Sequence, residues 1–285
     1  MGRLGIILSV LLMSGASTVT ALEQGSPLQS LDTADQNKGW ESVGRLNFAD
    51  EAYCTGSLIA EDLVLTAAHC LFNNQTGEKF EVGDIEFLAG WRNGRAAAYR
   101  GVDHIEVHPD FTFSVTDKVS RVAHDLALLR LDQPIKIASL KPFDVDARPE
   151  KGATVGVVSY AKNRSEAASL QESCKVMARQ GGVLVLSCEV DHGASGSPIF
   201  LMKEGEAPKI VSIVSAMAKV RDKDVALGTA LTRPLITLKE IMATDAGTEQ
   251  EPALLVTRDL PSVRTFGERE QASAGGAKFL KLNNN

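Results

Sequence analysis

Three short segments carry a histidine, an aspartate and a serine, in that order along the chain. They read TAAHC, HDLALL and GASGSP, around His69, Asp125 and Ser195. A serine hydroxyl is a poor nucleophile at neutral pH and needs a base within hydrogen-bond reach. That base needs a third group to fix its tautomer and to stabilise its charged form. The set predicts attack of the serine hydroxyl on an acyl carbon, with His69 as general base and Asp125 as its partner.

The glycines around Ser195 indicate how such a reaction could be stabilised. Gly193 and Gly196 permit backbone angles that a side chain would forbid. The N–H groups of Gly193 and Ser195 could then converge on a developing oxyanion, a contribution of roughly 3–4 kcal/mol per donor. The alternative is a Gly-Ser loop without function. Hydrolases of the Gly-x-Ser-x-Gly type are a competing template, but position 197 is Ser, the chain order differs and βα alternation is absent.

His124 is the neighbour that competes with Asp125 for a role in the site. The mainly apolar run at 126–131 that follows would carry the Asp125 carboxylate into the interior, so Asp125 is favoured. His124 is expected to be structural or partly exposed. Both residues also have a non-functional alternative. Without its motif, a histidine such as His69 would more often be a core residue, and an acid at the start of a strand, such as Asp125, would more often lie at the surface.

The segments that must position these residues have the pattern of short β-strands separated by turns. Twelve such runs fall into two sets of six, which predicts an all-β fold of two six-stranded antiparallel barrels rather than βα units. The first set comprises residues 41–46, 54–60, 63–68, 85–89, 102–107 and 126–131. The second comprises residues 154–160, 172–178, 183–188, 199–202, 210–215 and 227–231. A helical spacing follows Pro234 as far as Met242, which predicts a short C-terminal helix.

The bulk composition is that of a globular protein with an export signal. The chain has 285 residues, 44% of them hydrophobic, and a net charge of −6, which argues against nucleic acid or an acidic membrane as partner. Residues 1–21 have a positive start, an apolar run too short to span a bilayer, and small residues before a cleavage point. We therefore expect a removed signal peptide, no membrane partner after its removal, and a secreted or periplasmic protein.

The remaining domain boundaries follow from changes in this pattern. We expect a propeptide or flexible arm at 22–39 and an N-terminal barrel at 40–135. A C-terminal barrel with the helix is expected at 136–245, and a poorly ordered tail at 246–285.

Four cysteines allow three disulfide pairings, of which the local one, Cys54–Cys70 with Cys174–Cys188, is the simplest. Free core thiols are the alternative. No cluster of residues has zinc spacing, and the oxygen-rich loop at 73–78 is expected to be a structural turn rather than a calcium site. We therefore expect no metal and no cofactor.

Taken together, these motifs resemble the chymotrypsin-like (trypsin-like) serine peptidases, and in particular the bacterial branch that includes glutamyl endopeptidases. Four blocks match in order: residues 54–70 with a disulfide, HPDF at 108–111, HDLALL at 124–129 and GASGSP at 193–198. The match runs from about residue 40 to residue 233. The resemblance implies a monomeric serine endopeptidase that forms an acyl-enzyme on Ser195 and takes its polypeptide substrate in extended form along residues 213–215.

Departures from the family pattern bear on activation and specificity. Ala194 stands where animal members carry an aspartate that pairs with the new N-terminus, so that activation switch is expected to be missing. Glu189 falls near the acidic pocket residue of trypsin-like enzymes and would favour Arg or Lys substrates, although other bacterial members carry an acid there without this preference. Ser215 and Met217 are expected to line the substrate pocket, where Met217 would narrow it.

Two other functions stay open at this point. One is a peptidase-like binding protein that does not turn over substrate. The other is a peptidase held latent by its propeptide or by the tail after Ala243.

Overall fold

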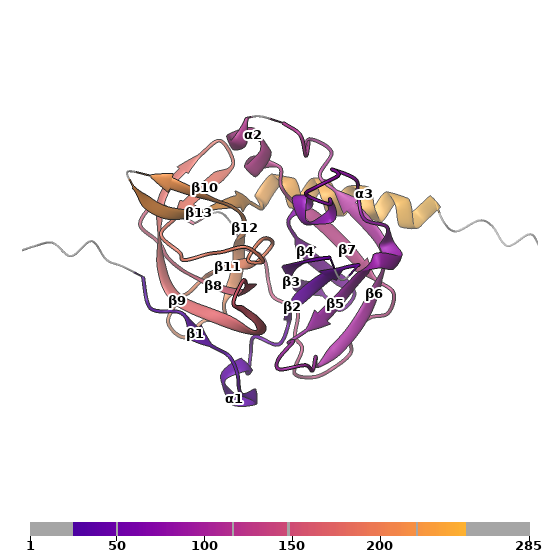
Figure 1. Cartoon of the computed structure of the whole chain (residues 1–285), viewed down its shortest axis with the longest axis horizontal. Coiled ribbons are helices and arrows are strands. Elements are labelled where there is room, and N and C mark those ends of the chain that lie inside the picture. Colours follow the sequence, from indigo (N-terminus) through magenta and orange to yellow (C-terminus); the bar gives the residue numbers. More distant parts are fainter. Residues whose placement is uncertain (1–24, 50, 116, 147–148, 221, 249–285) are drawn as a thin grey trace, which may run out of the picture. The chain divides into compact units, whose positions relative to one another are not determined.

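The computed structural model describes residues 25–248, apart from residues 50, 116, 147–148 and 221. These residues form two closed antiparallel barrels of six strands each, with short helices between strands and a longer one at the end (Figure 1). The predicted all-β, double-barrel fold with a C-terminal helix is confirmed. The expected signal peptide and nearly all of the expected tail lie outside the described residues.

The first barrel follows the strand order β2-β3-β4-β7-β6-β5 and closes where β5 pairs with β2. All six strands overlap the predicted runs. The main difference is that β6 starts at residue 98, four residues before the predicted run at 102–107. The strands are β2 (Val43–Phe48), β3 (Ala52–Ala60), β4 (Leu63–Thr66), β5 (Ile85–Ala89), β6 (Ala98–Val107) and β7 (Ala127–Leu131).

The second barrel closes through its longest strand, β9. One half of β9 pairs with β8 and the other half with β10, so the sheet curls back on itself. The half of β9 that the sequence did not predict buries small and polar residues such as Ala168, Ser169 and Gln171, which give no hydrophobic alternation. The strands are β8 (Thr154–Ala161), β9 (Arg164–Gln180), β10 (Val183–Leu186), β11 (Pro198–Leu201), β12 (Lys209–Val220) and β13 (Lys223–Ala230).

Three aromatic side chains join the two barrels. The ring of Phe200 on β11 lies edge-on to Phe143 at 4.7 Å and to Trp40 at 5.1 Å between ring centroids. Phe200 is fully buried, and it packs in the same hydrophobic cluster as the interior of the first barrel. Edge-to-face contacts add about 0.5–1.5 kcal/mol to the burial of each pair, so this cluster fixes one barrel against the other.

The segment before the first barrel packs against the second barrel. The short strand β1 (Gln29–Ser30) pairs with β9, and Leu31 beside it is only 1% exposed. A small helix, α1 (Ala34–Asn37), follows. Whether this range is removed during maturation stays a prediction.

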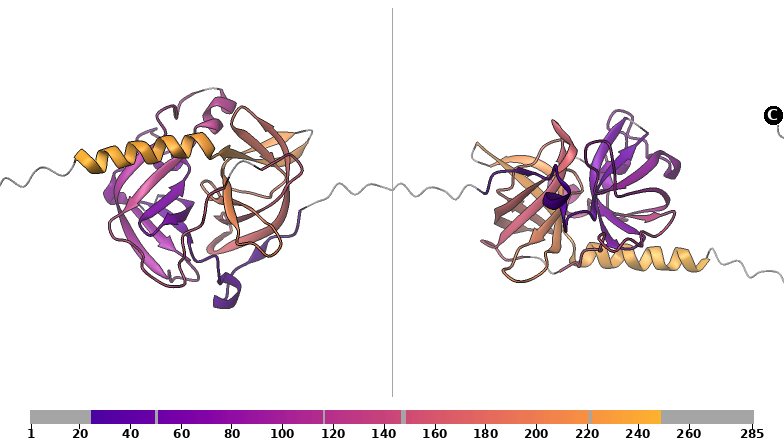
Figure 2. Two further views of the ribbon diagram at one scale, coloured as in Figure 1. Left: turned by 180° about the vertical axis from the view of Figure 1, so that it is seen from behind. Right: turned by 90° about the horizontal axis from the view of Figure 1, so that it is seen from below.

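Two helices flank the barrels (Figure 2). The short helix α2 (Lys118–Ala123) precedes β7 and contacts β13 and β10, and was not predicted. The C-terminal helix α3 (Thr232–Thr248) begins close to the predicted start and buries Leu238 in the cluster shared with the first barrel. None of the described helices has the length and apolar character needed to cross a bilayer.

Candidate active site

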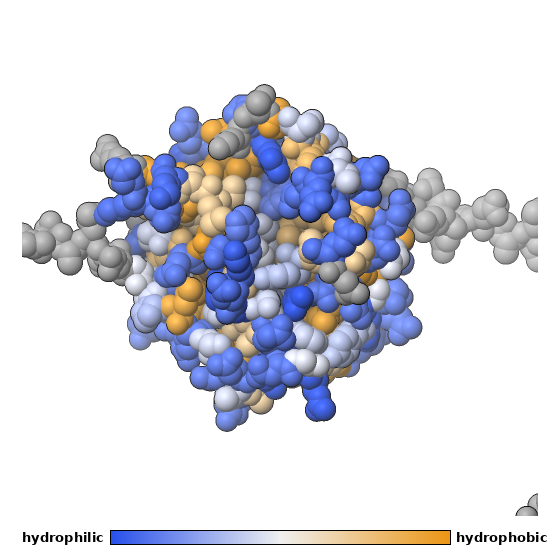
Figure 3. Space-filling model, viewed as in Figure 1, coloured by the Kyte–Doolittle hydropathy of each residue, from blue (hydrophilic) through white to orange (hydrophobic). Residues whose placement is uncertain are grey.

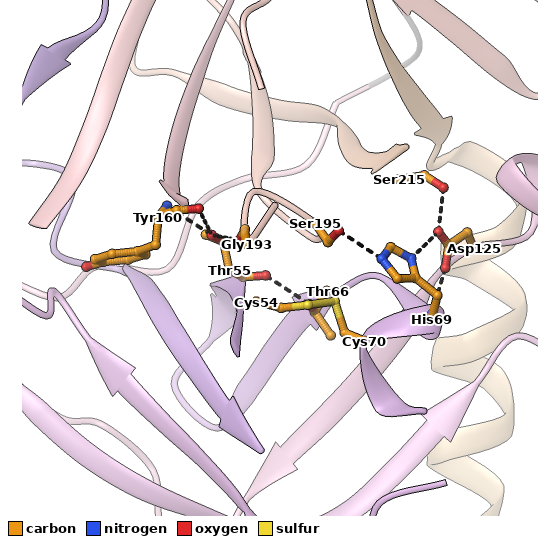
Figure 4. Close-up of a disulfide and its surroundings, with 10 residues drawn as sticks. All are labelled: Cys54, Thr55, Thr66, His69, Cys70, Asp125, Tyr160, Gly193, Ser195 and Ser215. Carbon is orange, nitrogen blue, oxygen red and sulfur yellow. Dashed lines mark hydrogen bonds and ion pairs between the residues drawn. A yellow bond between two sulfur atoms is a disulfide. The ribbon is translucent and has the colours of Figure 1, made fainter. Parts of the chain in front are cut away.

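The three residues singled out by chemistry come from loops at the ends of strands. His69 lies on a 3-10 turn (Ala68–Leu71) after β4, and Asp125 lies between α2 and β7. Ser195 lies in the turn before β11, so the second barrel supplies the serine and the first supplies the other two. Figure 4 shows the three side chains in one row. The structure thus brings together residues that are up to 126 positions apart.

A continuous hydrogen-bond chain links the three side chains. His69 Nε2 lies 2.8 Å from Ser195 Oγ, and His69 Nδ1 lies 2.7 Å from Asp125 Oδ2. The backbone N–H of His69 donates to Asp125 Oδ1 at 2.8 Å. The Asp125 carboxylate, 1% exposed, therefore holds His69 at two points, its backbone and its ring. The contact with the ring favours the tautomer that has its proton on Nδ1, which leaves Nε2 able to accept a proton.

Ser215 adds a fourth group to this chain. Its hydroxyl donates to Asp125 Oδ2, the oxygen that also accepts from the His69 ring. Ser215 lies on β12 in the second barrel, whereas Asp125 belongs to the first, so the bond crosses between them. The sequence assigned Ser215 to substrate binding and gave no signal of this contact.

Backbone hydrogen bonds from both barrels fix the loop that carries Ser195. Thr55 on β3 donates its N–H to the carbonyl of Ser195 at 2.9 Å and its hydroxyl to the carbonyl of Gly193 at 3.0 Å. Gly196 donates to the carbonyl of Val214 at 2.7 Å. The loop is therefore positioned before any ligand arrives.

The orientation of one peptide group decides where the Gly193 N–H points. The carbonyl of His192 accepts from the N–H of Lys162 at 2.7 Å. Because the carbonyl and N–H of a trans peptide point in opposite directions, the Gly193 N–H faces away from Lys162. Within the described residues, no hydrogen bond occupies the N–H of Gly193 or of Ser195, so both are available as donors.

Both glycines of this loop are required by their surroundings. Gly193 has φ of +93° and Gly196 has φ of +76°, in the region that side chains avoid. A Cβ at Gly193 would overlap the ring of Tyr53, and one at Gly196 would overlap the hydroxyl of Thr66 and the carbonyl of Thr55. The glycines let this loop approach the first barrel closely.

Two disulfides join the cysteines in the local pairing. Cys54–Cys70 connects β3 to the turn that carries His69 and lines the adjacent pocket. Cys174–Cys188 is buried in the core of the second barrel.

A pocket of about 720 Å³ opens beside Ser195 and His69. Val190, Ala216 and Met217 line it on the second-barrel side, and Tyr53 and Phe72 line it on the first-barrel side. Burial raises the pKa of Tyr53 above its usual range, against the opposing effect of nearby arginines, so this phenol is neutral at working pH. The site is thus a partly apolar cleft that Ser195 and His69 help to line.

Glu189 lies outside this pocket. Its exposed side chain lines a second pocket of about 550 Å³, which shares Asp191 and Met217 with the first. Arg164 lines the second pocket too. Burial lowers the pKa of Arg164, and the negative charges of Glu189 and Asp191 oppose that shift. The positive charge of Arg164 therefore already lies close enough to the Glu189 carboxylate to interact with it.

His124, the neighbour of Asp125, takes no part in the chain. Its ring stacks on His108 with 5.2 Å between centroids, and its Nδ1 lies 3.1 Å from the carbonyl of Ser120. His108 is 5% exposed and accepts from the N–H of Asp110. Burial, and then the neighbouring His124, lower the pKa of His108 below its usual value.

The oxygen-rich loop at 73–78 forms a turn organised by Asn73. The Asn73 side chain accepts from the N–H groups of Gln75 and Thr76 at 2.8 and 3.2 Å. No group of three or more metal-ligating side chains gathers among the described residues.

Comparison with known proteins gives sequence relatives that match part of this chain, and two of them illustrate the extent of the match. A 98-residue segment is 35% identical to coagulation factor IX of Cavia porcellus and covers 33% of this chain and 30% of that protein. A 114-residue segment is 32% identical to kallikrein 1-related peptidase b22 of Mus musculus and covers 38% and 41%. The matched segments thus span less than half the length of these curated relatives.

The fold and the family are matched over a larger part of the chain. A solved structure of Glu endopeptidase in complex with MPD superimposes with a TM-score of 0.62 and covers 78% of this chain and 98% of that one. At 16% identity this likeness concerns the fold alone. Residues 54–207 match the family model of the trypsin-like peptidase domain, and this chain belongs to that family.

Proposed function

We propose that this protein is a secreted or periplasmic serine endopeptidase that uses Ser195, His69 and Asp125. The observation that carries the proposal is the unbroken chain of hydrogen bonds from the Asp125 carboxylate through the His69 ring to the Ser195 hydroxyl. It stands beside two unoccupied backbone donors in the same loop. Membership of the trypsin-like peptidase family supports a polypeptide as substrate.

In the first half of the reaction, Ser195 Oγ attacks the carbonyl carbon of the substrate amide. His69 Nε2, 2.8 Å away, takes the hydroxyl proton, and Asp125 stabilises the imidazolium that results. The negative charge on the substrate oxygen is stabilised by the N–H groups of Gly193 and Ser195. His69 then returns the proton to the leaving amine, which leaves an ester on Ser195.

In the second half, water replaces the amine. His69 removes a proton from the water as it attacks the ester carbon, and the same two N–H groups stabilise the second oxyanion. The carboxylic acid product leaves and Ser195 regains its proton from His69. No further group is needed for this cycle.

The substrate is proposed to bind as an added strand along β12. Up to Ile213, β12 pairs with β11 on one side and β13 on the other, but beyond Val214 the described pairing is with β13 alone. The free edge next to Ser195 can pair with an extended peptide, and side chains of alternate residues then enter the pocket. Ser215 and Met217 lie on this edge and line that pocket.

Selection of a basic residue before the cut bond by Glu189 remains a hypothesis. Glu189 can contribute only if a substrate side chain passes Met217 into the second pocket, where Arg164 offsets its charge. Replacing Glu189 by Gln and profiling cleavage of a peptide library tests this, because only a carboxylate role predicts a loss of basic preference.

We also propose that residues 1–21 are removed on export and that residues 22–39 form a propeptide or arm ahead of the barrels at 40–135 and 136–245. Residues 246–285 are proposed to be a tail outside both barrels. N-terminal sequencing of the exported protein tests these boundaries. A start at residue 22 would identify residues 22–39 as a retained arm, and a start near residue 39 would identify them as a removed propeptide.

The catalytic proposal is tested by labelling with a fluorophosphonate probe together with peptide hydrolysis. We expect labelling and cleavage by the mature protein, loss of both in Ser195→Ala, and a fall in kcat of about 10⁴ in Asp125→Asn. Ser57→Ala is the matched control, because Ser57 is a buried serine on β3 outside the site.

Other results would favour the alternatives. A folded protein that never labels would favour a peptidase-like binding protein. Labelling that appears only after removal of residues 249–285 would favour a latent enzyme restrained by its tail.

A further inference from the structure

A third cavity, of about 440 Å³, shares His69 with the pocket beside Ser195, but neither Gly193 nor Ser195 lines it. Its apolar lining includes Val122, Ala216 and Leu227, and its lining also includes the cationic side chains of Arg121 and Lys219. Of the residues that line it, Asp125 alone is acidic.

Among the described residues, the Asp125 carboxylate forms no ion pair with these cations, and its oxygens are engaged elsewhere. Its Oδ1 accepts from the His69 backbone, and its Oδ2 accepts from the His69 ring and from Ser215. Lys219 forms an ion pair with Asp224 at 3.6 Å, and both side chains are largely exposed. Arg121 differs from Lys219, because its guanidinium lies over the ring of Phe113 at 5.1 Å and pairs with no described carboxylate.

The helix that carries Arg121 is fixed to the second barrel. The carbonyl of Val122 accepts from the Thr229 hydroxyl at 2.7 Å, and Val122 and Ala123 pack against Val183. The Asp117 side chain caps the start of the helix by accepting from Val119 N–H at 3.0 Å. Arg121 is therefore presented at a fixed place, half-exposed, rather than on a mobile loop.

Strand geometry decides which substrate side chains reach this cavity. Successive side chains of an extended peptide point to opposite sides. If the residue before the cut bond enters the pocket beside Gly193, then the second and fourth residues upstream point the other way, towards Val122 and Arg121. The first and third do not.

We infer that Arg121 selects substrates with an acidic side chain, Asp or Glu, at the second or fourth position upstream of the cut bond. This inference rests on the proposed function for the location of the substrate and adds the charge class of one of its side chains. Arg121 acts on binding, through the charge and hydrogen bonds of its guanidinium, and takes no part in the chemical step.

Binding to an inactive protein tests the inference independently of turnover. In Ser195→Ala, the dissociation constants of labelled extended peptides are measured by fluorescence polarisation, with Glu or Gln at each of the four upstream positions. We expect Glu to bind about three to ten times more tightly than Gln at the second or fourth position, and within about twofold at the third. The preference should weaken as the salt concentration rises.

Substitution of Arg121 then assigns the effect. Adding Arg121→Gln should make the Glu and Gln peptides bind equally, while Arg121→Lys should retain most of the preference. Lys136→Gln is the matched control, because it removes one exposed positive charge from outside the described pockets and should leave the preference intact. Thermal melting checks that each variant is folded.

Three results would overturn the inference: equal binding of Glu and Gln at the second and fourth positions, a preference for Glu at the third position only, or a preference that survives Arg121→Gln. In the active protein, the same peptides should differ in KM rather than in kcat. If the protein with Ser195 intact does not hydrolyse the peptides, but Ser195→Ala shows the expected binding pattern, the proposed function is refuted and this inference stands.

Discussion

The Ser215 hydroxyl and the His69 ring share one oxygen of the Asp125 carboxylate. Asp125 is almost fully buried, and its second oxygen accepts from the His69 backbone, so each of its side-chain hydrogen bonds holds either His69 or the neighbouring barrel. The bond from Ser215 therefore couples β12, the strand proposed to bind the substrate, to the orientation of the proposed base.

Ser215→Ala should lower kcat about tenfold with a smaller change in KM, because a hydrogen bond to a buried charge is removed. Steady-state kinetics on one peptide substrate measure this. Ser212→Ala is the control on the same strand. Its hydroxyl donates to the carbonyl of Thr229 at 2.7 Å, away from the carboxylate. It should cost about 1 kcal/mol of stability and leave kcat within twofold. Equal losses of kcat in both variants would contradict the assignment.

Gly193→Ala should reduce kcat by about 10²–10³, because the added Cβ meets the Tyr53 ring and displaces one oxyanion donor. Gly94→Ala provides the comparison, since Gly94 also has positive φ, +83°, but an added Cβ there meets open space. That variant should lose about 1 kcal/mol of stability and keep its activity. Kinetics and chemical denaturation on both variants separate a displaced donor from general backbone strain.

The two disulfides should differ in what their removal does. Replacing both cysteines of either pair by alanine should cost about 3 kcal/mol of unfolding free energy from the loop-closure entropy. Removal of Cys54–Cys70 should also lower kcat, because Cys70 follows His69 and the pair lines the pocket. Removal of Cys174–Cys188 should leave kcat unchanged below the new melting temperature. A loss of kcat in that second variant at low temperature would refute the distinction.

His108 should make the protein less stable in mild acid. Its folded pKa lies below the ordinary value of 6.5, so the unfolded chain takes up this proton first as the pH falls. The contribution of His108 to the unfolding free energy is therefore most favourable above pH 6.5, and it decreases as the pH is lowered below 6.5. Protonation would also end the hydrogen bond from Asp110 N–H to Nδ1.

An NMR titration of the His108 ring gives the direct measurement, with a midpoint expected below 6.5. His108→Gln should flatten the dependence of stability on pH in this range, whereas the same change at exposed His192 should not. A midpoint at or above 6.5 would show that His108 does not destabilise the protein in mild acid.

The fold could be predicted because each strand carries its own signal. β-branched and apolar runs bounded by glycine, proline and asparagine gave all twelve barrel strands. The first half of β9 was missed because it buries Ala168, Ser169 and Gln171, whose types do not alternate in hydropathy. The two-residue strand β1 and the one-and-a-half-turn helix α2 are too short for a periodic pattern, and tertiary contacts hold them in place.

The residues of the candidate site could be predicted from spacing and motif, but their supports could not. The hydroxyls of Thr55 and Ser215 act across 138 and 90 positions of the chain, and no local pattern reveals such contacts. Glu189 was assigned by its distance along the chain from Ser195. In the structure, Glu189 lines the neighbouring pocket and not the one beside Ser195, and distance along the chain could not distinguish the two.

The division of the proposed nucleophile and its base between two separately closed barrels has a consequence for biosynthesis. A ribosome that has released only the first barrel has made an imidazole and a carboxylate with nothing to activate, and a lone second barrel holds an inert alcohol. With the proposed roles of Ser195 and His69, hydrolysis requires both barrels to be closed and docked, so the nascent chain is expected to gain activity only at the final stage of its folding.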